Sequence, residues 1–188
     1  MKNLTPGSIR KGLTYLNTAI YNFSNHNEVI SKLHGVFDNK LEFQQAYDLY
    51  EANILNNIKY EWKDKVLSDN PEYALYYLKG MADYEPTQKA VTSNKIDFQQ
   101  YSTPLSIAYY MFRIANIQRF DTVLEPSAGT GVLATLAGLV TNQVIVNELE
   151  KDRLEILKYL GFKSVYSYDA KFIDDMLTPD IRPSVIKI

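Results

Sequence analysis

The part of the sequence that most constrains the fold is a short apolar run, followed by a loop with two glycines and then by a helical pattern. The run covers residues 122–124, the glycines are Gly129 and Gly131, and the helical pattern covers residues 132–139. Strands that alternate in this way with helices form a parallel sheet through right-handed crossovers, with helices on both faces. The sequence therefore predicts an α/β fold for this half of the chain. The predicted strands cover 122–124, 144–146, 164–168 and 184–188, and the predicted helices cover 104–117, 132–139, 151–160 and a stretch ending at 177.

The first half of the chain has a different periodicity. Apolar residues recur there at spacings of three or four, which is the pattern of amphipathic helices. These helical patterns cover residues 9–23, 41–62 and 73–81. The periodicity changes within residues 82–98. We therefore predict a small all-α domain over residues 1–88 and an α/β domain over residues 89–188.

Five of the fifteen tyrosines also lie at helical spacing in the first half. Tyrosine rings can stack on nucleic-acid bases, but regular spacing along a helix is more typical of packing against a core. We interpret these tyrosines as packing residues. They are Tyr47, Tyr50, Tyr73, Tyr76 and Tyr77.

The composition argues against several classes of site. The formal net charge is −2, whereas a protein that binds nucleic acid unaided is usually basic on at least one face. Any contact with DNA is therefore expected through a longer protein or a partner subunit. The chain has no cysteine, and His26 and His34 have no convergent acidic or cysteine pattern, so we expect no metal site. No apolar run is long enough to span a membrane and no signal peptide is expected, which favours the cytoplasm.

The glycine loop by itself fits two kinds of ligand. Residues 129–134, Gly-Thr-Gly-Val-Leu-Ala, match the dinucleotide-binding pattern G-x-G-x-x-G/A. A dinucleotide places its pyrophosphate at the start of the following helix, and the carboxylate of Glu125 beside the loop would repel it. S-adenosylmethionine has no phosphate but carries an ammonium and a sulfonium group. Glu125 therefore favours S-adenosylmethionine over a dinucleotide.

Two further acids follow the next two predicted strands. Glu148 comes after the second strand, where a carboxylate can accept hydrogen bonds from both ribose hydroxyls while Leu149 covers the adenine. Asp169 comes after the third strand and can accept a hydrogen bond from the adenine amino group. The carboxyl ends of parallel strands meet at one edge of the sheet, where such folds bind ligands. The sequence therefore predicts an adenosine site at this edge.

The order of these segments resembles the amino-group DNA methyltransferases, particularly the N6-adenine enzymes of restriction–modification systems and of methylase–helicase fusions. Residues 99–104 are similar to the short Tyr/Thr-Pro motif that precedes the glycine loop in that family, and residues 125–131, 146–149 and 168–170 are similar to its three cofactor motifs. The resemblance covers about half of the chain. It implies a partial Rossmann-like methyltransferase sheet, preceded by the all-α domain.

The resemblance also implies that S-adenosylmethionine is the cofactor and that Thr103 holds its methionine carboxylate. The expected cofactor-binding residues combine the family motifs with the acids at the strand ends. They are Tyr101, Thr103, Pro104, Glu125, Pro126, Ser127, Ala128, Gly129, Gly131, Glu148, Leu149, Asp169 and Ala170.

One departure from the family concerns the catalytic motif. In the family a polar residue, two prolines and an aromatic residue directly follow the fourth strand, hold the target amino group and stack on the flipped base. Residues 184–188 resemble that strand, and no Asn-Pro-Pro or Asp-Pro-Pro occurs in the sequence. We therefore predict no catalytic residue in this chain and expect the cofactor-binding portion of a DNA adenine-N6 methyltransferase, inactive alone.

Several alternatives remain open. The chain could be a non-catalytic protein that binds the cofactor or a partner, or a methyltransferase of RNA or protein, or a dinucleotide-binding domain. The last strand also bears on association. If residues 184–188 form an unprotected edge, they favour either self-association through that edge or a frayed strand.

Overall fold

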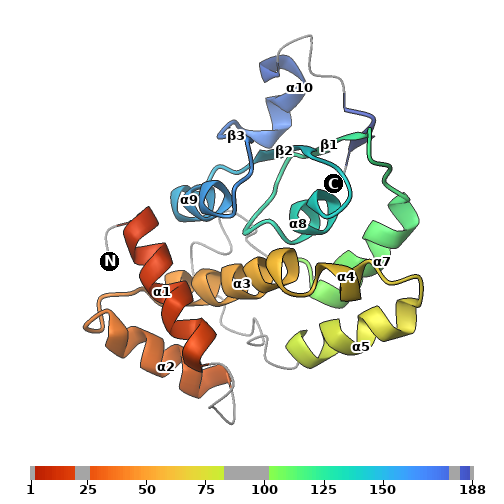
Figure 1. The fold of residues 1–188 in the computed structure, drawn as a ribbon. Helices are drawn as coiled ribbons and strands as arrows, with labels where there is room; N and C mark the ends of the chain where they lie inside the picture. Colours follow the sequence, from red (N-terminus) through yellow and green to blue (C-terminus); the bar gives the residue numbers. More distant parts are fainter. Residues whose placement is uncertain (1–2, 20–25, 83–101, 178–182, 187–188) are drawn as a thin grey trace.

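A computed structural model describes residues 3–19, 26–82, 102–177 and 183–186 of the chain (Figure 1). The described residues before residue 83 form helices and their connections and no strand, as the periodicity predicts. The long pattern over 41–62 forms one helix, α3, that ends before Trp62, and a short helix, α4, follows it. The sequence patterns did not delimit α2. The helices are α1 (Pro6–Ala19), α2 (His26–Val36), α3 (Phe43–Tyr60), α4 (Lys63–Val66) and α5 (Pro71–Ala82).

Local capping explains where two of these helices begin. The side chain of Gln45 reaches back to the backbone N–H of Glu42, which closes a capping box at the start of α3. At the start of α5, the side-chain oxygen of Asn70 accepts hydrogen bonds from the backbone N–H groups of Glu72 and Tyr73. Asn70 is therefore the cap of α5, and Pro71 is its first residue.

The second part of the chain alternates strands and helices. Helix α7 starts one residue later than predicted, because Pro104 is its N-cap and not its first residue. Strand β3 is shorter than predicted, and β4 is a two-residue strand at the start of the predicted range. The elements are α7 (Leu105–Ala115), β1 (Thr122–Glu125), α8 (Val132–Gly138), β2 (Gln143–Asn147), α9 (Lys151–Tyr159), β3 (Ser164–Tyr166), the 3₁₀ helix η2 (Ala170–Phe172), α10 (Ile173–Met176) and β4 (Val185–Ile186).

The strands form a small parallel sheet in the order β3-β2-β1-β4. Val123 of β1 is paired with Val144 of β2 on one side and with Val185 of β4 on the other. Helices α8 and α9 lie on one face of the sheet and α10 lies on the other (Figure 1). The predicted α/β class is therefore confirmed.

The helical part packs directly on this α/β part. Helix α3 contacts α8 and α9, α1 contacts α9, and α5 contacts α7, so the buried apolar residues form one continuous core. Helix α3 is buried on almost every side, with Leu49 and Tyr50 fully buried. The predicted boundary at residues 88 and 89 lies outside the described residues. None of the described helices is long and apolar enough to cross a membrane.

The tyrosines divide between core and surface. Tyr47 and Tyr50 on α3 are buried, as predicted. Tyr73 and Tyr76 on α5 are 45% and 74% exposed, so the prediction that they pack in the core is wrong. The buried face of α5 is formed by Ala74 and Leu78, and the two tyrosines lie on other sides of the helix. Their rings contact the ring of Tyr77 instead.

Candidate functional site

The loop between β1 and α8 needs glycine at two positions. Gly129 has φ +57° and Gly131 has φ +100°, a region that other residues rarely adopt. A Cβ atom on Gly131 would lie 2.8 Å from Cδ2 of Leu157, so any side chain there would force the Leu157 side chain on α9 to move. A Cβ atom on Gly129 would meet no atom nearer than 3.9 Å. The loop therefore needs Gly131 for packing as well as for its backbone conformation, and Gly129 only for the backbone.

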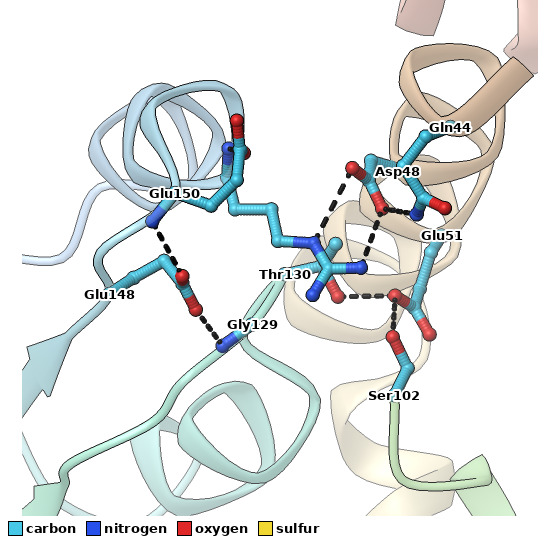
Figure 2. Close-up of polar contacts among 9 residues, drawn as sticks. Gln44, Asp48, Glu51, Ser102, Gly129, Thr130, Glu148 and Glu150 are labelled. Atoms are coloured by element: carbon cyan, nitrogen blue, oxygen red, sulfur yellow. Dashed lines mark hydrogen bonds and ion pairs between the residues drawn. The ribbon is translucent and has the colours of Figure 1, made fainter. Parts of the chain in front are cut away.

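Glu148 connects the loop after β2 to the glycine loop. Its Oε2 atom accepts a hydrogen bond of 2.7 Å from the backbone N–H of Gly129, and its Oε1 atom accepts one of 2.8 Å from the backbone N–H of Glu150 (Figure 2). A carboxylate has about four acceptor positions, so each oxygen can accept a further hydrogen bond. The structure thus places the predicted ribose-binding acid against the predicted glycine loop.

Asn147, the last residue of β2, holds the three strand-end loops together. Its Nδ2 donates to the backbone oxygen atoms of Pro126 at 2.9 Å and of Tyr168 at 2.8 Å, and its Oδ1 accepts from the backbone N–H of Tyr168 at 2.8 Å. Its own backbone oxygen accepts from the N–H of Ala128 at 2.9 Å. Asn147 is fully buried. Asn147 lies within the motif of residues 146–149, but no role was predicted for it from the sequence.

The other residues predicted after β1, β2 and β3 lie at the same edge. Glu125 ends β1 and is only 4% exposed, so its carboxyl group lies beneath the loop and not on the surface. Leu149 and Asp169 are exposed, and Asp169 caps η2 by accepting a hydrogen bond of 3.0 Å from the N–H of Lys171. In the loop itself Ala128 is buried. Pro126 and Ala170 are half-buried, and Ser127 is exposed.

The predicted motif before α7 lies partly within the described residues. Thr103 is half-buried and Pro104 is exposed, while Tyr101 lies outside the described residues. The preceding residue, Ser102, donates a hydrogen bond of 2.8 Å from its hydroxyl to Oε2 of Glu51 on α3. The start of α7 is therefore tied to the helical part of the chain.

A buried polar network extends from α3 to the glycine loop (Figure 2). Oε2 of Glu51, which accepts from Ser102, also accepts a hydrogen bond from the hydroxyl of Thr130, the residue between the two glycines. One turn away, Asp48 forms an ion pair of 3.3 Å with Arg153 of α9. The side chains of Glu51, Thr130, Asp48 and Arg153 are almost completely buried, and Ser102 is half-buried. The sequence patterns did not predict this network, because its partners come from distant segments, although Glu51 lies on the apolar stripe itself, four residues after Tyr47 and three before Ile54.

Burial controls the ionisation of the network. Burial raises the pKa of Glu51, and the hydrogen bonds from Thr130 and Ser102 offset part of that rise. Burial also raises the pKa of Asp48, against the opposing effect of Arg153. The pKa of Arg153 itself is raised by Asp48 in spite of burial, so its guanidinium group stays charged. A charged arginine in this position stabilises the network at the base of the loop.

Comparisons with known proteins add no assignment. A scan against protein-family models, a search of curated proteins and a search of solved structures each found no match. The interpretation of the site therefore depends on its own residues and their geometry. Among the described residues, no group of three or more histidine and acidic side chains is arranged to hold a metal ion.

Proposed function

We propose that the carboxyl edge of the sheet binds S-adenosylmethionine, and that the chain is the cofactor-binding portion of a DNA adenine-N6 methyltransferase. One observation carries the first part of this proposal. The carboxylate of Glu148 is fixed against the backbone of Gly129, at the end of the strand next to the one that ends in the buried Glu125. A glycine loop flanked by two carboxyl groups suits a ligand with positive charges and ribose hydroxyls.

The same contact argues against a dinucleotide. A pyrophosphate would need the free N–H groups of the loop and of the first turn of α8. The N–H of Gly129 instead donates to Glu148. A phosphate placed there would lose that donor and would face a carboxylate at short range, which is repulsive in a partly buried site.

The residues at this edge fit the parts of the cofactor. Glu148 has spare acceptor positions for the ribose hydroxyls, and the exposed carboxylate of Asp169 is free to accept from the adenine amino group as well as from its own helix. Thr103 would hold the methionine carboxylate. It directly follows Ser102, which is connected to the glycine loop through Glu51. S-adenosylmethionine supplies an electrophilic methyl group, and the role of this chain would be to bind and orient its donor.

The second part of the proposal, the DNA substrate, is supported by the resemblance of four segments to the amino-group DNA methyltransferases. The residues of that family that hold the target base have no counterpart in this sequence. In the proposed function, the target adenine is therefore held by residues outside this chain. The net charge of −2 agrees with that division, since the phosphates would be bound elsewhere.

Calorimetry on the full chain tests the cofactor assignment. We expect S-adenosylhomocysteine and S-adenosylmethionine to bind with micromolar dissociation constants and NAD to show no binding. Tighter binding of NAD than of S-adenosylhomocysteine would overturn the assignment. Binding of neither ligand would also reject it.

A further inference from the structure

Helix α3 contacts the glycine loop through a single buried carboxyl group. Glu51 accepts the hydroxyl hydrogen bonds of Thr130 and Ser102 on the same oxygen atom, Oε2. Thr130 is 1% exposed and lies between the two glycines of the loop, while Ser102 directly precedes Thr103 and Pro104. Figure 2 shows the three side chains converging from three separate segments of the chain.

We propose that Glu51 is a positioning residue of the cofactor site, which fixes the glycine loop and the segment before α7 relative to each other. This inference rests on the proposed function, because these are two of the segments expected to hold the cofactor. In this proposal α3 positions two segments of the cofactor site, although α3 belongs to the helical half of the chain.

The loop needs such a contact because of its composition. Glycine restricts the backbone least of all residues, so Gly129 and Gly131 leave the loop poorly ordered unless other contacts hold it. Thr130 has the only side chain between them, and that side chain is directed toward α3 and not toward the sheet edge (Figure 2). A contact at Thr130 therefore restricts both flanking glycines at once.

The chemistry of Glu51 supports a role beyond space filling. A buried carboxyl group is costly unless hydrogen bonds compensate for the lost water, and an apolar side chain would fill the same volume without that cost. The charged groups that face Glu51 are Asp48 on its own helix and Arg153 on α9. Arg153 is also the nearest neighbour of the Cβ position of Gly129, at 3.9 Å. The network thus reaches the loop at two adjacent residues.

Three variants of the full chain test the proposal. Glu51→Ala removes the contact, and Glu51→Gln keeps an acceptor oxygen and tests for rescue. Lys11→Met is the control, because Lys11 is on α1 in the same helical half and its Nζ donates a hydrogen bond of 2.7 Å to the backbone oxygen of Val36 on α2. Each variant is measured by thermal unfolding, by amide hydrogen exchange of residues 127–131 without ligand, and by calorimetry with S-adenosylhomocysteine.

We expect Glu51→Ala to speed loop exchange and to weaken S-adenosylhomocysteine binding by about tenfold, the size expected for a lost buried hydrogen bond to a carboxyl group. Glu51→Gln should stay within about twofold of the wild-type affinity, since it keeps one acceptor. Lys11→Met should leave loop exchange and affinity unchanged. A folded Glu51→Ala protein with wild-type loop exchange would overturn the proposal.

Two further variants cover the case in which Glu51→Ala does not fold. Thr130→Val removes the same hydrogen bond from the loop side with little change of shape, and Thr130→Ser keeps the hydroxyl. Faster loop exchange in the valine variant alone supports the proposal, and equal exchange in both contradicts it. Loop exchange is measured without ligand, so a failure of the wild-type chain to bind S-adenosylhomocysteine rejects the proposed function separately.

Discussion

Replacement of Gly131 by alanine separates the packing of the glycine loop from its backbone conformation. The new Cβ atom would lie 2.8 Å from Cδ2 of Leu157 and 3.4 Å from the ring of Phe162, so side chains on and after α9 must move. Overpacking of this kind costs about 1–3 kcal/mol. The backbone at φ +100° adds about 1–2 kcal/mol for a residue with a Cβ atom. We therefore expect Gly131→Ala to lower the free energy of unfolding by about 2–5 kcal/mol.

Two other glycine replacements calibrate this result in urea denaturation. The new Cβ atom of Gly129→Ala would meet no atom nearer than 3.9 Å, so this replacement should cost only the strain of the left-handed backbone, about 1–2 kcal/mol. Gly35→Ala, within α2 and with open space around its Cβ position, should be stabilising by about 0.5–1 kcal/mol. Equal losses for Gly131→Ala and Gly129→Ala would refute the argument that the loop is packed against Leu157.

The remaining predictions concern the residues around the loop. Asn147→Leu should lower the free energy of unfolding by about 2–4 kcal/mol in urea denaturation, because it leaves buried backbone groups of the neighbouring loops without partners. Glu148→Ala should weaken S-adenosylhomocysteine binding at least about tenfold by calorimetry, and unchanged affinity would mean that the ribose is held elsewhere. Burial raises the pKa of Glu51 above its ordinary value of 4.5, so the folded protein binds that proton more tightly and loses stability as the pH rises through this range. Glu51→Gln should therefore gain stability relative to wild type as the pH rises above 4.5, and parallel stability curves would contradict this. The chain alone should transfer no tritiated methyl group to DNA containing adenine, and incorporation above a no-enzyme control would show otherwise.

Local patterns in the sequence were sufficient to predict most elements of the α/β half. Strand β1 extends one residue beyond its predicted range at one end and β2 one residue at each end, because polar residues bound their apolar runs closely. Strand β3 is shorter than predicted for a tertiary reason. The backbone N–H and oxygen atom of Tyr168 bond to the side chain of Asn147 and so leave the strand. The side chain of Asn147 on β2 therefore ends the pairing of β3 with β2. The apolar periodicity of the sequence carries no information on such a contact.

The candidate site was predictable where its residues follow strands, and not where they come from α3. Acids after consecutive parallel strands must meet at one edge, so the grouping of Glu125 and Glu148 follows from topology alone. Glu51 lies on the apolar stripe of α3, four residues after Tyr47 and three before Ile54, so its position in the sequence indicates burial. The groups that contact Glu51 and Asp48 come from α9, the loop and the segment at Ser102. Only the packing of these distant segments could identify the network.

The buried network also bears on how the two halves of the chain depend on each other. Arg153 is 4% exposed on α9 and is paired with Asp48 on α3. Removal of one partner of a buried ion pair is strongly destabilising, since it leaves an uncompensated charge. Without α3, Arg153 would lose its carboxylate and Thr130 would lose its acceptor. The helical half therefore supplies the inner support of the glycine loop, whereas the residues expected to contact the cofactor come from the α/β half.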